Sequence, residues 1–178
     1  MNSRFTFRKA AAFVALSLFL PAWHVLAQGN PTRMPAHEDS VSVFGAIQGH
    51  ATGTVEFPSL QAAAGGEGTM SRFGRFTYSL QATVDLTTGR SNGAFVLIFS
   101  NGDALYGVLS GQGDAPPPTP PTLGHITEQL TISGGRGRFQ DASGNLTFDR
   151  VVDSTNTPAF DLHSGTVTGT ISISRSAK

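Results

Sequence analysis

The fold of this chain is decided by a glycine-punctuated corner, Ile132-Ser133-Gly134-Gly135-Arg136-Gly137-Arg138-Phe139-Gln140-Asp141-Ala142-Ser143-Gly144. Its glycines suit a tight turn with positive φ angles, and Phe139 is placed to tuck beneath that turn. We expect a single helical turn over residues 141–143. The glycine spacing fits neither a dinucleotide-binding fingerprint nor a P-loop, and no helical pattern follows. The corner therefore predicts architecture and carries no phosphate-binding chemistry.

Alternating segments lie on both sides of this corner and along most of the chain. The clearest runs from Phe76 to Leu86, where every second residue is apolar, as in a strand with one buried face. Asn101-Gly102-Asp103 separates two further runs and predicts a hairpin. A loop is expected over residues 62–69, which are mostly alanine and glycine. The expected strands cover residues 41–47, 51–57, 76–86, 94–99, 104–110, 125–133, 145–152 and 160–174.

Short antiparallel strands with regular turns predict an all-β fold, and closure into a single antiparallel β-barrel removes exposed strand edges. About eight strands enclose an interior just wide enough for side chains or one small ligand. The proline-rich residues 114–122 are interpreted as a stiff surface loop. The barrel domain is expected over residues 41–178, after a flexible leader over residues 28–40 that has no apolar period.

Residues 1–27 have the pattern of a secretory signal peptide. Arg4, Arg8 and Lys9 precede an apolar run, and Val25-Leu26-Ala27 is typical of a cleavage site. The apolar run is about half the roughly 20 residues that a membrane-spanning helix needs. We therefore expect an exported protein, periplasmic or extracellular, with no integral membrane span after cleavage.

Cleavage leaves 151 residues with nine Lys and Arg against twelve Asp and Glu, a formal charge of −3. A negative charge argues against a nucleic-acid partner, although residues 72–78 superficially match the basic-aromatic strands that stack RNA bases. The chain has no cysteine, and its histidines lack a second ligand at a familiar metal spacing. We expect no metal, no cofactor and no nucleic acid, and the oligomeric state stays open.

The candidate ligand-binding residues are polar residues in phase with inward-facing apolar ones. Glu128, Arg150 and His163 each share the apolar face of a strand, and Tyr78 lies on the apolar face of its own strand. Two interpretations are open. A buried carboxylate and guanidinium pair to avoid desolvation, which joins Glu128 to Arg150. Alternatively, a carboxylate beside an imidazole acts as general base and acid on a bound substrate.

Several segments, in this order, resemble a group of small exported bacterial proteins with an allene oxide cyclase-like β-barrel. The matching segments are residues 72–77, 100–105, 125–128, 130–135, 137–139, 142–144 and 165–171. The resemblance implies an eight-stranded barrel related to the plant cyclases and dirigent proteins, which steer cyclisation or coupling of an apolar substrate without a metal. The plant cyclases use a pocket cysteine, which this chain lacks, so the resemblance transfers no catalytic residue.

Three functions follow from these expectations. The leading hypothesis is an exported, soluble barrel that binds a small apolar or amphipathic molecule in its lumen. The second is a cofactor-free cyclase or isomerase in which Glu128 or His163 moves a proton. The third is a structural or interaction protein with a filled barrel and an exposed apolar patch. The polar outward face of residues 77–85 argues against an outer-membrane barrel.

Overall fold

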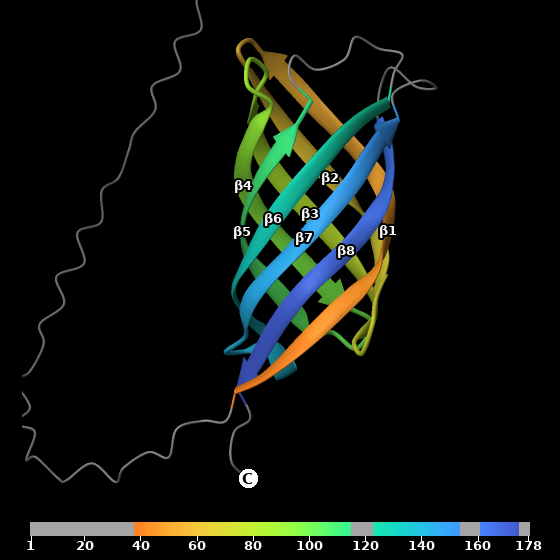
Figure 1. The fold of residues 1–178 in the computed structure, drawn as a ribbon, viewed down its shortest axis with the longest axis vertical. Helices are drawn as coiled ribbons and strands as arrows, with labels where there is room; N and C mark the ends of the chain where they lie inside the picture. Colours follow the sequence, from red (N-terminus) through yellow and green to blue (C-terminus); the bar gives the residue numbers. More distant parts are fainter. Residues whose placement is uncertain (1–37, 115–122, 154–160, 175–178) are drawn as a thin grey trace, which may run out of the picture. The chain divides into compact units, whose positions relative to one another are not determined.

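The computed structural model describes residues 38–114, 123–153 and 161–174, which form a closed antiparallel β-barrel (Figure 1). Each strand pairs with the next along the chain, and the last pairs with the first to complete the closure. The predicted all-β class and single eight-stranded barrel are confirmed. The strands are β1 (Glu38–Glu56), β2 (Ser59–Met70), β3 (Gly74–Asp85), β4 (Arg90–Phe99), β5 (Ala104–Gly113), β6 (Leu123–Arg136), β7 (Ser143–Asp153) and β8 (Asp161–Ser174).

The first two strands differ from the prediction. The expected strands over residues 41–47 and 51–57 are one continuous strand, β1, which begins at Glu38 within the expected leader. The expected loop over residues 62–69 is wrong, because these residues belong to β2 and pair with both β1 and β3. One missed strand and one divided strand thus left the predicted total at eight.

Small residues explain why β2 lacks an apolar alternation. Its Gly66 and Gly68 lie opposite Tyr78 and Phe76 of β3. A Cβ atom at Gly68 would lie 2.6 Å from the tip of the Phe76 ring, so β2 needs a residue without a side chain where it pairs with the large side chains of β3. The strand is identified by its pairing and by its neighbour's side chains, and not by its own hydrophobic pattern.

The inward side chains of the other strands form the core. In β3, Phe76, Tyr78 and Leu80 are buried, whereas the intervening Thr77 and Ser79 are exposed, as the alternation predicts. Burying one large aliphatic or aromatic side chain contributes about 1.5–3 kcal/mol, so a filled interior stabilises the barrel without disulfides. The most completely buried side chains are Leu97, Leu105, Leu130, Phe139, Leu146, Phe148, Val167 and Ile171.

One end of the barrel is closed by aromatic rings, and we call it the aromatic end. Phe139 is fully buried, with its ring centroid 5.1 Å from those of Phe73 and Phe99. The Arg138 guanidinium lies 4.9 Å from the centroids of both Phe73 and Phe139, and its Nε is 2.9 Å from Oδ2 of Asp103. The glycine-punctuated corner therefore builds a lid on the barrel.

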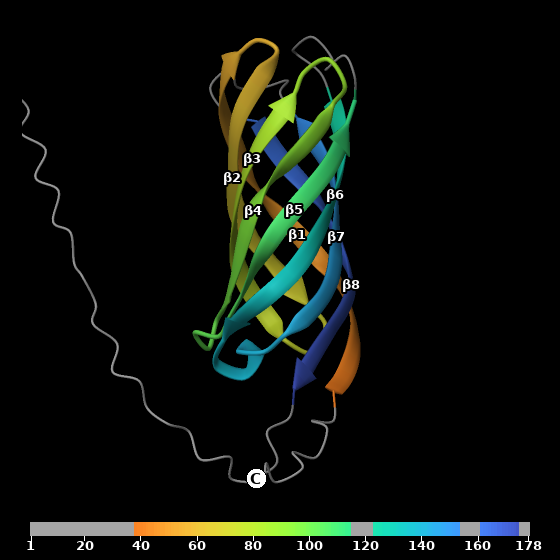
Figure 2. The same cartoon turned by 90° about the vertical axis from the view of Figure 1, so that its left-hand side faces the viewer.

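The helical turn of this corner is a 3-10 turn, η1 (Gly137–Phe139), and not residues 141–143 as expected. Gly137 has a φ of 68°, and a Cβ atom there would lie 1.9 Å from Oδ1 of Asp103. The contact with the β4–β5 hairpin therefore sets where the turn begins. The turns between β1 and β2 and between β3 and β4 lie together at the opposite end of the barrel, which we call the hairpin end (Figure 2).

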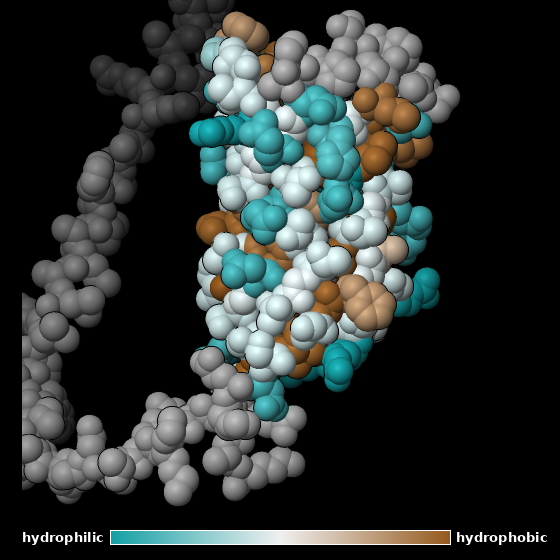
Figure 3. All heavy atoms as spheres, in the orientation of Figure 1, coloured by the Kyte–Doolittle hydropathy of each residue, from teal (hydrophilic) through white to brown (hydrophobic). Residues whose placement is uncertain are grey.

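The outer wall carries apolar groups that are scattered among polar and weakly polar ones on the face seen in Figure 3. Among the described residues, no helix is long and apolar enough to cross a bilayer. The expected signal peptide and leader up to residue 37, and residues 115–122 of the proline-rich segment, lie outside the described residues. Exposed large apolar side chains on β4 and β5 are Val96, Ile98, Tyr106 and Val108.

Candidate functional site

The four candidate side chains predicted to point into the barrel come from four different strands. Tyr78 of β3, Glu128 of β6, Arg150 of β7 and His163 of β8 are 5%, 3%, 4% and 4% exposed. The predicted inward direction of these side chains is confirmed by their burial. Charged side chains are almost never this buried unless they are paired, so each partner has to be identified. We call these four residues the polar quartet.

Glu128 and Arg150 pair with each other. In the register of β6 and β7, Glu128 lies opposite Phe148 and Arg150 lies opposite Ile126, so the two charged residues are diagonal neighbours on one face. Nη2 of Arg150 donates to Oε1 of Glu128 at 2.7 Å. The predicted ion pair is confirmed. It stabilises both charges in an interior where either one alone would be strongly destabilising.

The ion pair uses only part of the hydrogen-bonding capacity of the quartet. Oε2 of Glu128, Nε and Nη1 of Arg150 and Nδ1 of His163 are buried without a hydrogen-bond partner among the described residues. Most buried polar groups in native proteins are satisfied, and leaving one unsatisfied costs about 1–3 kcal/mol. The quartet thus presents donors and an acceptor that suit a bound polar group.

Tyr78 and His163 form the second pair, through a hydrogen bond between the Tyr78 hydroxyl and Nε2 of His163. Because a phenol is a stronger acid than an imidazole N–H, we assign the hydroxyl as the donor and the remaining ring proton to Nδ1. Burial raises the pKa of Tyr78 to about 12, partly opposed by the charge of Arg150. Burial and the positive charge of Arg150 lower the pKa of His163 to about 4. Both side chains are therefore uncharged at neutral pH.

The two pairs decide between the interpretations left open by the sequence. The imidazole of His163 has a phenol as its hydrogen-bond partner, and the carboxylate of Glu128 has a guanidinium. The predicted placement of a carboxylate beside an imidazole is therefore replaced by two separate pairs. Arg150 connects them electrostatically, because its charge acts on the pKa of both Tyr78 and His163.

Ser91 is a fifth buried polar residue, 6% exposed, that the sequence analysis missed. Register places it opposite Gly111 of β5, which lies opposite Glu128 of β6. A Cβ atom at Gly111 would lie 2.4 Å from Oγ of Ser91 and 2.9 Å from Cγ of Glu128, so only this glycine lets the two side chains share the space. The expected strand began at Ala94. Extending its alternation backwards from Phe95 would have found Ser91.

The surroundings of the ion pair differ on its two sides. Toward the aromatic end, Leu130 and Phe148 are fully buried, and the Phe148 ring meets Tyr78 edge-on with centroids 5.6 Å apart. Toward the hairpin end, Ile126 and Val152 are only partly buried. The ion pair therefore lies at the boundary between a packed core and apolar side chains that solvent reaches.

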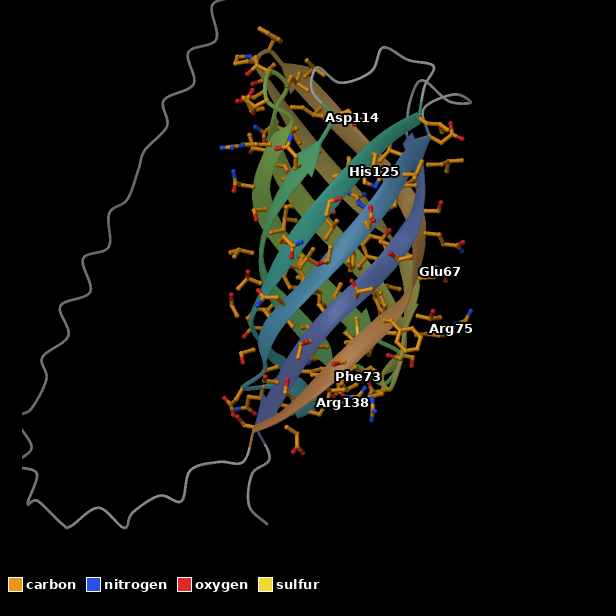
Figure 4. The ribbon with its side chains drawn as sticks, viewed as in Figure 1. Glu67, Phe73, Arg75, Asp114, His125 and Arg138 are labelled. Atoms are coloured by element: carbon orange, nitrogen blue, oxygen red, sulfur yellow. The ribbon has the colours of Figure 1, made fainter. Side chains whose placement is uncertain are left out.

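A second feature lies on the outer wall, away from the quartet. A groove of about 530 Å³ runs over β1 to β4, and Glu67 and Arg75 are among its lining residues (Figure 4). Nε2 of Gln48 donates to Oε1 of Glu67 at 2.9 Å, so the carboxylate is held by a neighbour on the same wall. Among the described residues, no group of three His, Cys, Asp or Glu side chains is placed to hold a metal ion.

The basic-aromatic stretches have structural roles. Phe76 and Tyr78 point into the core, and Arg138 stacks on the aromatic end.

Comparison of the chain with family models, curated proteins and solved structures finds no match in any of the three. The function is therefore inferred from the polar quartet.

Proposed function

We propose that this protein is an exported β-barrel that binds one small amphipathic molecule inside the barrel, with its polar end at the quartet. The observation that carries this proposal is the set of buried donors and acceptors on Glu128, Arg150 and His163 that have no partner within the described residues. A barrel interior that served packing alone would be more stable with apolar side chains at these positions. A ligand that forms hydrogen bonds with these unpartnered atoms would explain why polar side chains occupy these positions.

The position of the quartet supports access from the hairpin end. Val84, Ile126 and Val152 are partly exposed there and supply an apolar lining, whereas the core beyond Glu128 and Arg150 is packed. Binding sites for small molecules commonly combine such an apolar lining with a few convergent polar groups. An amphipathic molecule would place its polar end at the quartet and its apolar part against these side chains.

Export and kinship belong to the same proposal. The signal-peptide pattern of residues 1–27 supports export. The eight-stranded barrel is the fold expected from the resemblance to the exported allene oxide cyclase-like proteins. The only tryptophan is Trp23, so cleavage after Ala27 yields a protein without tryptophan fluorescence. An exported fraction that keeps this fluorescence, or a mass that includes residues 1–27, would overturn the export proposal.

The binding proposal is tested by native mass spectrometry of the protein from its exported fraction, compared with the denatured mass. We expect a small additional mass that is lost on denaturation. The matched control is the double variant Glu128→Gln with Arg150→Met, which keeps side-chain size and leaves no buried charge. It should fold, as judged by circular dichroism, and carry no additional mass. A bare mass for the natural protein, with ordered waters on the free atoms in a crystal structure, would favour a filled structural barrel.

A cofactor-free isomerase or cyclase is the second candidate, and the Tyr78–His163 hydrogen bond favours it. A neutral imidazole that accepts a hydrogen bond from a phenol is a suitable group to move a proton on a bound substrate. Once the ligand is identified, conversion by the natural protein and loss of conversion with retained binding in Tyr78→Phe would support catalysis. Retained ligand without conversion would leave binding as the whole function.

A further inference from the structure

The free atoms of the ion pair define a hydrogen-bonding pattern. Nε and Nη1 of Arg150 can only donate, and Oε2 of Glu128 can only accept. Nη2 of the same guanidinium donates to Oε1 of the same carboxylate at 2.7 Å, so the free donors and the free acceptor belong to one hydrogen-bonded pair. A group that satisfies both therefore needs an acceptor adjacent to a donor.

The buried side chains that the structure describes around these atoms carry no net charge. Glu128 and Arg150 cancel each other, and the other two members of the quartet, Tyr78 and His163, form an uncharged hydrogen-bonded pair. Ser91, the other buried polar side chain in the described part of the chain, is uncharged as well. A ligand with a charged end would place an uncompensated charge in this interior, at a large desolvation cost.

We propose that the polar end of the bound molecule is uncharged and carries a hydrogen-bond acceptor next to a donor, as in a primary amide or an undissociated carboxylic acid. This rests on the proposed function. The carbonyl oxygen accepts from one of the free N–H groups of Arg150, and the N–H or O–H donates to Oε2 of Glu128. His163 lies opposite Val152 and is therefore a diagonal neighbour of Arg150, and its Nδ1 is also buried without a partner among the described residues.

Three ligands with the same alkyl chain test this proposal: octanamide, octanoic acid and octylamine. Titration calorimetry on the mature protein should show octanamide binding with the same affinity at about pH 5.5 and about pH 7.5, while octylamine binds at least about 100-fold more weakly. A carboxyl group titrates at about pH 4.3, so octanoic acid should lose about tenfold in affinity per pH unit over this range. Native mass spectrometry provides the stoichiometry, expected to be one per barrel.

Variants of the ion pair test the proposal through ligand preference, which would not change if Glu128 and Arg150 had a purely structural role. Glu128→Gln leaves Arg150 uncompensated, so octanoate should become the preferred ligand at about pH 7.5, with its pH dependence lost. The double variant Glu128→Gln with Arg150→Met keeps the interior neutral and should reject both charged ligands. It provides the test if the single variant Glu128→Gln does not fold. The exposed groove variant Arg75→Gln is the control and should bind as the natural protein does.

The possible outcomes separate the two proposals. Octanoate or octylamine binding the natural protein at about pH 7.5 as tightly as octanamide would overturn the uncharged-end proposal and leave the binding function in place. No binding of any of the three, together with a bare native mass, would overturn both. Selective binding of octanamide with reversal of preference in Glu128→Gln supports both.

Discussion

The aromatic end and the polar quartet occupy the same barrel but are built on opposite principles. At the aromatic end, Phe73, Phe99 and Phe139 fill the opening, and the Arg138 guanidinium lies over the rings and pairs with Asp103. At the quartet, Glu128 and Arg150 pair inside and leave hydrogen-bonding atoms unused. The comparison teaches that packing accounts for the first region, whereas the quartet keeps buried polar atoms without partners among the described residues.

The largest expected effect is on the aromatic end. Phe139→Ala removes a fully buried ring that contacts two others and leaves a cavity, so we expect a loss of about 4–5 kcal/mol in the free energy of unfolding, measured by urea denaturation. Phe57→Ala is the control, because this ring is 77% exposed and its loss should change stability by less than about 0.5 kcal/mol. Equal effects of the two changes would contradict the description of the aromatic end as a packed lid.

Breaking the ion pair comes next. Glu128→Gln leaves the buried charge of Arg150 unpaired, and we expect a loss of about 3–4 kcal/mol in urea denaturation. Adding Arg150→Met removes that charge and should return the stability to within about 1 kcal/mol of the natural protein. A double variant as unstable as the single one would show that the pair is required for packing, and would weaken the contrast between the two regions.

The third effect is a pH dependence that belongs to the quartet. The pKa of His163 is lowered from 6.5 to about 4 in the folded protein, so the unfolded chain binds a proton in this range while the folded chain does not. Stability should therefore fall as the pH decreases from 6.5 to about 4 and level off below, by about 3 kcal/mol in total. His163→Gln should lose this component, whereas the exposed His125→Gln should retain it. An unchanged slope in His163→Gln would refute the assignment.

The smallest effect tests how the lid is held. Arg138→Ala removes the stacking on Phe73 and Phe139 and the partly exposed pair with Asp103, for an expected loss of about 1 kcal/mol. Arg138→Lys keeps the charge and loses the planar stacking, so its stability should lie between the two. Thermal unfolding resolves this difference. A lysine variant as stable as the natural protein would assign the contribution to charge alone.

The predicted fold was right in class for reasons that can be located. Strong alternation in residues 76–86 and the turn at residues 101–103 predicted β3 and the β4–β5 hairpin correctly, because their apolar side chains face the core themselves. β2 was missed because its inward residues are small. Its conformation depends on pairing with β1 and β3, and the apolar groups that fill the space beside it come from β3.

The candidate site was predictable to a similar extent. Period-two phase predicted that Glu128, Arg150 and His163 point inward, and the cost of an unpaired buried charge predicted the ion pair. The phase of a strand does not determine which inward residues meet across the barrel. The hydrogen bond between Tyr78 and His163 joins residues 85 positions apart, and the side chains of Ser91 and Glu128 both occupy the space that a side chain at Gly111 would need.

The amino-acid sequence by itself determined that the chain is all β, that it closes into a barrel, and which faces of most strands point inward, because these properties follow from local alternation and turn chemistry. Tertiary structure alone decided that residues 62–69 are a strand, where the lid turn begins, and which polar atoms are paired or free. Those outcomes depend on register and on side-chain volume from distant strands, and both are defined only when the barrel is closed.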